Sequence, residues 1–279
     1  MDFLGRKVLD ASQCKIFVLD EADNMINVRN DGEEDHTMEV YQYLPENCQI
    51  LLFSATWSDQ VYERAQHMAP DAVTTLRLRD PELTLKGIKQ LYMDCTGEDA
   101  KIDVLMALYG LLTIGQSIVF VRSQKKAEEI VAKMEDEGHV VGFIHGGLTG
   151  FDRDKIMDNF RAGRSKVIVT TNVLARGINI LQVNLIINFD MPIRYVNTRG
   201  GGRTKELDFE TYLHRIGRTG RFGRAGLVIN FVHDEQSFEE MMEIQRHFET
   251  QNQIVRIKTD SYDILEKMLK LAMKGKPSA

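Results

Sequence analysis

Short, continuous runs of hydrophobic residues recur along the chain, and amphipathic stretches separate most of them. The first two runs lie within residues 15–20 and 49–54, and neither alternates polar with apolar positions. Runs of this length are typical of strands buried on both faces, as in a parallel sheet. Both runs end in small or acidic polar residues, and the ligands of open α/β sheets bind beyond the carboxyl ends of the strands.

The same pattern of hydrophobic runs separated by amphipathic stretches repeats several times after a charged stretch around Pro81. The expected strands cover residues 88–95, 117–121, 140–144, 167–170, 185–189 and 227–232. The expected helices cover residues 99–112, 124–137, 152–162, 211–217, 235–249 and 260–274. Strand alternating with helix predicts repeated βαβ units and a parallel sheet.

The two parts of the chain differ in how complete a fold they predict. Residues 88–279 are long enough for a whole α/β domain, whereas residues 1–80 offer only two clear strands. Two strands are too few for an independent doubly wound domain. We therefore expect residues 1–80 to be the back half of a domain whose first half is absent, and residues 81–87 to be a linker.

Composition narrows the class of protein. The 279 residues are 43% hydrophobic and 27% charged, which is typical of a soluble globular chain. No apolar run reaches the ~18 residues of a membrane helix, so we expect no membrane insertion, and the N-terminus does not look like a secretory signal. The three cysteines, Cys14, Cys48 and Cys95, have the spacing of neither a zinc site nor a disulfide framework. We expect them to be buried structural thiols in a reducing compartment.

Charge is distributed unevenly along the chain. Residues 1–85 hold 7 Lys and Arg against 16 Asp and Glu, whereas residues 194–224 hold 8 basic and 3 acidic side chains. An acidic chain can bind nucleic acid where its positive charge is local. The net charge of −6 therefore does not exclude a nucleic-acid partner.

Two motifs follow the first two expected strands. The sequence Asp20-Glu21-Ala22-Asp23 places carboxylates where one can hold Mg²⁺ through water and the next can polarise an attacking water. An acidic loop that merely follows a strand is the plainer interpretation. Ser54-Ala55-Thr56 is by itself a common strand-end or cap pattern, and gains weight from standing some thirty residues after the carboxylates.

Two further motifs lie in the second part. Thr170-Thr171-Asn172 runs into Leu174-Ala175-Arg176-Gly177-Ile178-Asn179, where hydroxyls and backbone N–H groups suit phosphate oxygens, although an ordinary strand-to-helix turn would look similar. The segment His214-Arg215-Ile216-Gly217-Arg218-Thr219-Gly220-Arg221 is the sharpest signal. Arg218 and Arg221 would share a face of one helical turn, and paired guanidiniums can stabilise charge on a transferring phosphoryl group. A solvated basic face fits the interleaved glycines poorly.

Together these four motifs resemble those of the DEAD-box RNA helicases of helicase superfamily two, in the same order and at similar spacing, over nearly the whole chain. Segments 87–95 and 108–117 look like the subfamily that acts in mRNA export at the cytoplasmic face of the nuclear pore. The resemblance implies two RecA-like domains that clamp ATP between them and bind single-stranded RNA. The expected fold is therefore a RecA-like parallel sheet flanked by helices, forming a complete C-terminal helicase domain over 88–279, plus a partial N-terminal RecA-like domain.

The resemblance also implies roles for individual residues, with ATP and Mg²⁺ as cofactors. Asp20 would coordinate Mg²⁺ through water and Glu21 would activate the attacking water. The residues expected to couple hydrolysis to domain closure are Asp23, Ser54, Thr56 and His214. The residues expected to face the nucleotide are Gly177, Asn179, Arg218 and Arg221. The residues expected to contact RNA are His145, Gly146, Arg153 and Thr171. The implied partners are single-stranded RNA, the missing N-terminal half and a nuclear-pore activator protein with inositol phosphate, in the cytoplasm and at the pore.

Three departures from the family pattern change what we expect of this chain. These residues contain no G-x-x-x-x-G-K-[ST] phosphate-binding loop, so the chain alone should hydrolyse ATP negligibly. Asn179 stands where the family usually has Asp, which should weaken a hydrogen bond to the nucleotide ribose. Residues 194–210 are longer than the family loop and predict a mobile surface insertion, with an extra RNA or partner contact as the functional alternative.

Two hypotheses of different class remain open. The first is the C-terminal part of an ATP-dependent RNA helicase that remodels ribonucleoprotein in mRNA export. The second is a non-catalytic RecA-like module that binds RNA or an activator, which the missing phosphate-binding loop favours. A DNA-directed enzyme is less well supported, because nothing in the sequence suggests contacts to base edges.

Overall fold

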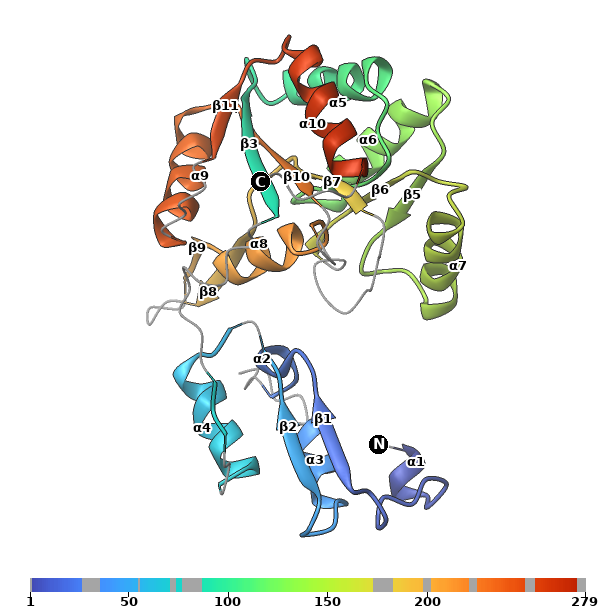
Figure 1. Cartoon of the computed structure of the whole chain (residues 1–279), viewed down its shortest axis with the longest axis vertical. Helices are drawn as coiled ribbons and strands as arrows, with labels where there is room; N and C mark the ends of the chain where they lie inside the picture. The colour runs from blue at the N-terminus through green and yellow to red at the C-terminus, as the bar shows by residue number, and fades with distance from the viewer. Residues whose placement is uncertain are drawn as a thin grey trace. The chain divides into compact units, whose positions relative to one another are not determined.

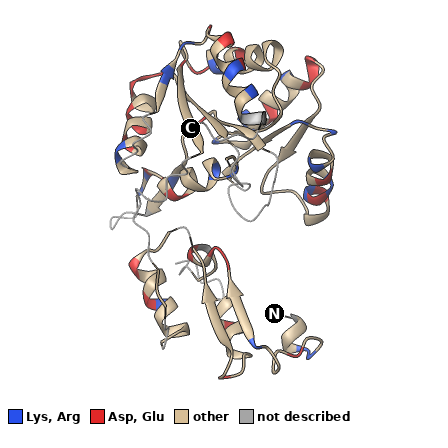
Figure 2. Ribbon diagram, in the orientation of Figure 1, with Lys and Arg blue, Asp and Glu red and all other residues tan. Residues whose placement is uncertain are grey.

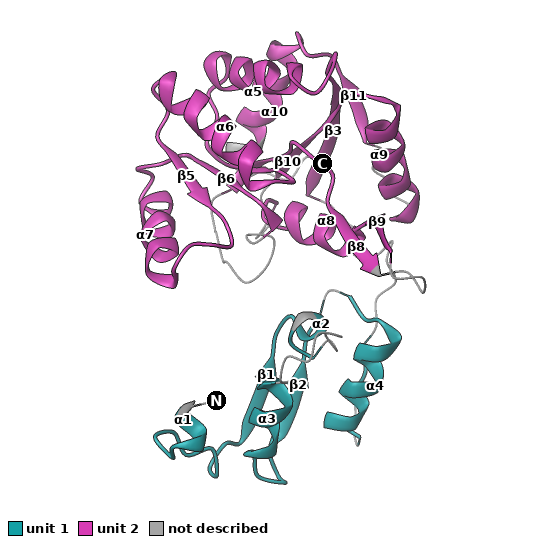
Figure 3. Ribbon diagram, turned by 180° about the vertical axis from the view of Figure 1, so that it is seen from behind, with its two compact units in different colours: residues 1–78 teal, residues 79–279 magenta. Residues whose placement is uncertain are grey.

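A computed structural model describes residues 2–26, 36–54, 56–70, 74–76, 87–172, 183–197, 202–220, 225–248 and 254–274 (Figure 1). The chain divides into two compact units, Met1–Leu78 and Arg79–Ala279 (Figure 3). Each unit has its own hydrophobic core. Within the described residues, no helix is both long and apolar enough to cross a membrane.

Unit 1 is built around two short parallel strands. Its elements in chain order are α1 (Asp2–Gly5), β1 (Ile16–Leu19), α2 (Ala22–Met25), α3 (His36–Gln42), β2 (Gln49–Leu52) and α4 (Asp59–Met68). Ile16 pairs with Gln49 and Leu19 with Leu52. The Ser58 side chain accepts a hydrogen bond from the Val61 amide and so caps the start of α4.

The expectation that both strands are buried on two faces is wrong for β1. Leu19 is buried, but Ile16 and Val18 are 54% and 53% exposed. Successive side chains of a strand point to opposite faces, so only one face of β1 is covered in this unit. Continuous hydrophobicity indicated that both faces need cover, and the described residues provide it for only one.

Unit 2 contains a seven-stranded sheet in which every neighbouring pair is parallel. The strands are β3 (Ile88–Asp94), β4 (Gln116–Phe120), β5 (Val141–Ile144), β6 (Val167–Thr170), β7 (Val183–Asn188), β10 (Gly226–Val232) and β11 (Val255–Ile257). Their order across the sheet is β11-β3-β10-β7-β4-β6-β5. The predicted α/β class and parallel sheet are therefore confirmed.

Helices cover both faces of this sheet (Figure 1). They are α5 (Ala100–Leu111), α6 (Gln124–Asp136), α7 (Gly150–Arg161), α8 (Phe209–Ile216), α9 (Glu235–His247) and α10 (Tyr262–Lys274). One face is apolar: Leu105 of α5, Ile130 of α6 and Leu269 of α10 share a core with alternate strand residues such as Val119. The other face carries buried polar groups. There the Tyr212 hydroxyl of α8 donates a hydrogen bond to Gln90 Oε1 at 2.7 Å.

The predicted mobile insertion contains regular structure. Strands β8 (Ile193–Asn197) and β9 (Arg203–Leu207) form an antiparallel pair. Residues 198–201, between the strands, lie outside the described residues. Leu207, at the end of β9, is buried, whereas the four residues before it in the strand are exposed.

Cysteine burial follows the prediction only in part. Cys95 is 3% exposed in the core of unit 2, as expected. Cys14 and Cys48 are half-buried in unit 1, so the expectation of buried thiols is wrong for these two. Both precede a strand rather than lying within one, which explains their partial exposure.

Candidate functional site

The chain turns sharply where β1 ends, and acidic residues gather there (Figure 2). Asp20 is exposed, and its Oδ1 accepts a hydrogen bond from the Glu21 amide at 2.9 Å. Glu21 has φ 52° and ψ 47°, a left-handed conformation that is uncommon for a residue other than glycine. The Ala22 amide donates to the Phe53 carbonyl at 3.0 Å and holds the turn against β2. Strain of this kind is concentrated at functional sites.

The carboxylate of Asp23 joins the two motifs of unit 1. Asp23 is 4% exposed. The Ser54 hydroxyl donates to its Oδ1 at 2.5 Å, and the Thr56 hydroxyl donates to its Oδ2 at 2.8 Å. The Asp23 amide in turn donates to Ser54 Oγ at 3.1 Å. Both carboxylate oxygens are therefore hydrogen-bonded, as a buried carboxylate requires.

Asp20 fits a site that binds Mg²⁺ through an intervening water. Asp20 is exposed at a strand end, and among the described residues only its Oδ1 accepts a backbone hydrogen bond. Mg²⁺ keeps several waters and is bound in proteins by one or two carboxylates together with phosphates. One accessible carboxylate oxygen is sufficient for this role.

In unit 2, the residues expected to contact RNA lie at the carboxyl ends of two adjacent strands. Ile144 of β5 pairs with Thr170 of β6, so His145 and Thr171 follow paired positions. The Thr170 hydroxyl donates to the Ile144 carbonyl at 2.8 Å and ties the two ends together. Gly146 is exposed beside them. The topology thus brings the His145-Gly146 turn and Thr171 together, although they are far apart in the sequence.

His145 and Arg153 have distinct environments at this edge. The His145 ring lies 4.7 Å from the Phe143 ring, and its Nδ1 faces the Gly147 amide at 3.2 Å. Arg153 projects from α7, the next helix, and is half-buried. Its Nε is buried and has no hydrogen-bond partner among the described residues. A guanidinium with an unused donor at an exposed edge can bind an anion.

The second part of the sharpest motif is not helical, which corrects one expectation. Helix α8 ends at Ile216, and Gly220 has φ 69°. Arg218, which is 5% exposed, therefore lies in a turn beyond the helix, so the argument that it shares a helical face with Arg221 is wrong. A Cβ on Gly220 would come within 2.6 Å of Ile88, so glycine is required both for conformation and for space.

The remaining predicted site residues are His214, Gly177, Asn179 and Arg221. His214 lies in α8, is 10% exposed at the side chain and has Nε2 3.8 Å from Glu210 Oε1. The residues that lie outside the described part of the chain are Gly177, Asn179 and Arg221.

Sequence reasoning missed Arg215, which is fully buried. Its guanidinium donates to Asn188 Oδ1 at 3.0 Å, to the Asp190 carbonyl at 2.7 Å and to Asn172 Oδ1 at 2.5 Å. It also lies 4.8 Å from the centre of the Phe120 ring. Burial lowers the pKa of Arg215 to about 9. Arg215 thus connects the ends of strands β4 and β7 with the segment after β6.

The signal for Arg215 was present in the sequence. Arg215 stands three residues after Tyr212 and four after Thr211, both of which are buried. Residues at this helical spacing lie on one face, so the arginine had to face the sheet. The sequence motif assigned Arg218 and Arg221 to the nucleotide and gave Arg215 no role, whereas the structure shows that Arg215 supports the scaffold.

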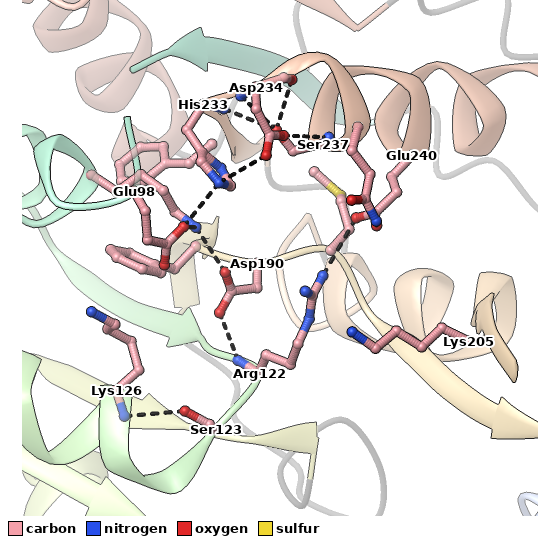
Figure 4. A pocket seen from close by; sticks show the side chains of 15 residues that line it. Glu98, Arg122, Ser123, Lys126, Asp190, Lys205, His233, Asp234, Ser237 and Glu240 are labelled. Atoms are coloured by element: carbon pink, nitrogen blue, oxygen red, sulfur yellow. Dashed lines mark hydrogen bonds and ion pairs between the residues drawn. The ribbon is translucent and has the colours of Figure 1, made fainter. Parts of the chain in front are cut away.

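A cavity of about 280 Å³ opens beyond the carboxyl ends of β4, β7 and β10 (Figure 4). It was not predicted from the sequence. Lys101 is 1% exposed and bridges Asp190 at 2.7 Å and Glu98 at 3.0 Å. The Glu98 carboxylate also faces His233 Nε2 at 3.1 Å. Burial alone would raise the pKa of Asp190, but the Lys101 ammonium and the Arg122 amide hold that pKa below its usual range. The cavity wall is thus a network of paired charges.

Comparison with known families divides the chain as the motifs do. Residues 1–65 match the DEAD/DEAH box helicase family, and residues 100–223 match the helicase conserved C-terminal domain. Among curated proteins, the chain is 53% identical over 274 residues to the ATP-dependent RNA helicase dbp5 of Schizosaccharomyces pombe. That match covers 98% of this chain and 52% of the relative, so the chain spans about half the length of the curated relative it matches.

Solved structures give the same result. The S. cerevisiae Dbp5 bound to RNA and ADP BeF3 is 46% identical, with a TM-score of 0.82, over 98% of this chain and 66% of that one. A variant of that protein bound to Nup159, Gle1, IP6 and ADP is 43% identical, with a TM-score of 0.65, over 98% of this chain and 67% of that one.

Proposed function

The chain belongs to the DEAD-box family of ATP-dependent RNA helicases, and from this membership we propose that it supplies the catalytic carboxylates and the second RecA-like domain of an enzyme that clamps single-stranded RNA and remodels ribonucleoprotein. The observation that carries the proposal is the doubly hydrogen-bonded Asp23, which joins the motif Asp20-Glu21-Ala22-Asp23 to Ser54 and Thr56. Residues 1–80 would then be the remnant of the first domain, 81–87 the linker and 88–279 the second domain.

The end of β1 would perform the chemistry of phosphoryl transfer. Asp20 would hold Mg²⁺ through water, and a metal bound there would neutralise charge on the phosphates. Glu21 would accept a hydrogen bond from the attacking water and orient it. The fixed left-handed turn at Glu21 supports this role because it sets the direction of the side chain.

The second domain would complete the nucleotide site. Arg218 and Arg221 would stabilise charge that develops on the transferring phosphoryl group. Gly177 would lie near the γ-phosphate, and Asn179 would accept a hydrogen bond from the ribose less strongly than an aspartate. Replacing Asn179 with Asp should therefore raise nucleotide affinity in a chain that has a phosphate-binding loop, and equal affinity would contradict this assignment.

Hydrolysis would be coupled to the closure of the two domains through polar contacts. Asp23, Ser54 and Thr56 link the segments that follow β1 and β2, so a shift of one segment displaces the other. We assign His214 to the same role from the second domain. This coupling would convert the state of the nucleotide into a grip on RNA.

RNA would be held through its backbone. His145, Gly146 and Thr171 follow the carboxyl ends of β5 and β6, and Arg153 lies in the first turn of α7. A hydroxyl, a glycine and a guanidinium suit phosphate oxygens. Contacts of this kind carry no base information, so binding should be largely independent of sequence.

The relatives suggest where the enzyme works. One solved relative is bound to RNA, and another to Nup159, Gle1 and IP6. We propose single-stranded RNA, a nuclear-pore protein and an activator with an inositol phosphate as partners, and mRNA export as the process.

A non-catalytic binding module is the alternative for this polypeptide by itself. These 279 residues contain no G-x-x-x-x-G-K-[ST] segment, whose backbone amides and lysine would cradle the phosphates. A pure binding module would, however, have no chemical use for Glu21 at its strained turn.

An ATPase assay separates the two hypotheses. We expect no RNA-stimulated turnover by the chain alone, and turnover when the phosphate-binding half of the S. pombe relative is fused to its N-terminus. Glu21→Gln should abolish that turnover, whereas Glu46→Gln, at an exposed position, should not. Turnover by the chain alone that Glu21→Gln abolishes would overturn the proposed dependence on the other half. A folded fusion that binds RNA without turnover would favour the binding module.

A further inference from the structure

Two cysteine thiols of unit 1 lie next to each other. Cys14 precedes β1 and Cys48 precedes β2, and their sulfur atoms are 3.9 Å apart. The sulfur of Cys14 also faces the Ile16 carbonyl at 3.4 Å. We propose that Cys14 and Cys48 form a reversible intramolecular disulfide, which makes the pair a site of oxidative modification.

The backbone brings the segments that carry the two cysteines together. The Gln49 amide donates to the Lys15 carbonyl at 2.9 Å, so the chain segments are paired next to the cysteines. The register that pairs Ile16 with Gln49 leaves Cys14 and Cys48 one residue out of step, and both residues precede the strands. Their sulfur atoms, 3.9 Å apart, must approach by about 2 Å to reach the S–S bond length of about 2.05 Å.

Local turns hold each cysteine in place. The Cys14 amide donates to the Ala11 carbonyl and the Cys48 amide donates to the Pro45 carbonyl, both at 2.9 Å. Because both residues are fixed, the encounter of the two sulfurs requires little loss of chain entropy. This pre-organisation favours an intramolecular bond over a bond to another protein.

Access distinguishes this pair from the third cysteine. Cys14 and Cys48 are half-buried, whereas Cys95 is buried in the core of the other unit. An oxidant dissolved in water can therefore reach the pair and not Cys95. Among the described residues, the pair belongs to no group of three or more potential metal ligands, so disulfide chemistry suits it better than a metal ion.

The oxidant we assign is a low-molecular-weight disulfide such as oxidised glutathione. The Cys14 thiolate attacks one glutathione sulfur, the glutathione disulfide breaks, and one glutathione leaves as a thiolate. Cys48 then loses its proton and attacks the Cys14 sulfur, which releases the second glutathione. The protein loses two electrons and two protons, and two molecules of reduced glutathione form.

The order of attack follows from the environment of Cys48. Burial, and then its contact with Cys14, raise the pKa of the Cys48 thiol. A raised pKa keeps Cys48 protonated, so it acts second, on a sulfur that is already activated.

The bond would restrain the strands that carry the candidate catalytic residues. Cys14 and Cys48 precede β1 and β2, while Asp20 and Ser54 follow the same strands. A disulfide would therefore fix the amino ends of both strands without covering the catalytic edge. The inference does not depend on the helicase assignment.

Mass spectrometry of the full chain tests the proposal. The reduced protein is incubated with oxidised glutathione, unfolded and alkylated with N-ethylmaleimide. We expect two alkylation sites to disappear, a peptide linking Cys14 to Cys48 to appear, and dithiothreitol to reverse both changes. Glutathione adducts on both cysteines, or dimers joined between chains, without the linked peptide would overturn the proposal.

Three variants complete the test. Cys14→Ser and Cys48→Ser should each lose the linked peptide and retain one glutathione adduct, whereas Cys95→Ala should keep the link. A linked peptide that persists in Cys14→Ser would refute the assignment. If a variant does not fold, the parent protein still decides, because oxidation should raise the melting temperature of unit 1 by several degrees. An unchanged melting temperature with a complete link would contradict the restraint on the strands.

Discussion

The Ser54 hydroxyl lies 2.5 Å from Oδ1 of Asp23, and this contact joins two segments separated by thirty-one positions in the sequence. The carboxylate is almost completely buried, and the Ser54 hydroxyl that donates to it is half-buried, so the hydrogen bond is largely shielded from water. Thr56 occupies the second oxygen. The candidate site of unit 1 is therefore also part of its core, and changes there should affect stability as well as activity.

Ser54→Ala should destabilise unit 1. The change removes one donor from a buried carboxylate and the acceptor of the Asp23 amide. We expect the free energy of unfolding to fall by about 1–3 kcal/mol. Trp57, the single tryptophan of the chain, packs against the core of unit 1, so urea unfolding followed by its fluorescence reports on this unit.

Two variants control the Ser54→Ala measurement. Thr56→Ser keeps the hydroxyl that donates to Oδ2 and should cost less. Thr75→Ala changes an exposed position and should have almost no effect. Equal destabilisation by Ser54→Ala and Thr75→Ala would show that the hydrogen bond contributes nothing.

Arg215→Met should strongly destabilise unit 2. The side chain is fully buried, and its removal leaves the oxygens of Asn188 and Asn172 and the Asp190 carbonyl without this donor. We expect a loss of at least about 3 kcal/mol, since the fully buried Asn188 loses a charged donor. Circular dichroism during urea unfolding measures the loss.

Arg215→Lys tests whether geometry or charge matters. Lysine retains the charge but not the planar fork, so it should recover only part of the loss. Arg246→Met, at an exposed position of α9, serves as the control and should be nearly neutral. Full recovery by lysine would show that the charge alone stabilises this region.

The sequence predicted most of unit 2 because its pattern is set by burial. The continuous apolar run of β6 sits in the interior of the sheet, and its predicted and observed bounds, Val167–Thr170, coincide. Strand β11 was missed because it has three residues, of which only Ile257 is buried. In unit 1, Ile16 and Val18 are exposed. A hydrophobic run therefore predicts that both faces of a strand should be packed, but it does not show whether the packing residues are present.

The sequence predicted the parts of the candidate site in which the residue type itself indicates the chemistry. The carboxylates after β1 and the hydroxyls after β2 were placed correctly because strand ends converge in a parallel sheet. Arg218 was assigned to a helical turn although the predicted helix, 211–217, ends before it, and the observed helix ends at Ile216 with Gly217 as its C-cap. The cavity beyond β10 is lined by five separate segments of the chain, and no local pattern encodes it.

The stability of unit 2 should fall as the pH rises above about 8.5. Burial raises the pKa of Cys95 to about 12. An unfolded cysteine loses its proton near pH 8.5, so between pH 8.5 and 12 the folded state holds a proton that the unfolded state has lost. Unfolding then releases a proton, and the free energy of unfolding decreases with pH. Burial raises the pKa of Tyr212 as well, which adds to the fall above about pH 10.

Variants separate these contributions. Cys95→Ala should flatten the decrease between pH 8.5 and 10, and Tyr212→Phe should flatten it above pH 10. Tyr43→Phe, at an exposed position, should change neither range. The lowered pKa of Arg215 has the opposite sign, since it adds stability at high pH, so each variant is compared with the parent at the same pH. Parallel curves for Cys95→Ala and the parent would refute the assignment.

Arg153→Ala should weaken RNA binding by the same factor for every sequence. Its buried Nε, which has no hydrogen-bond partner among the described residues, and its position in the first turn of α7, the helix after β5, favour a phosphate contact. Loss of one phosphate contact should lower the slope of log affinity against log salt by about 0.7 for a single strand. Fluorescence anisotropy with oligo-uridine and oligo-adenosine at several salt concentrations measures both quantities. Arg161→Ala, at the exposed end of the same helix, has the same charge change and should leave the slope unaltered. A loss confined to one oligonucleotide would mean that Arg153 contacts a base, and an equal loss in Arg161→Ala would reduce its role to bulk charge.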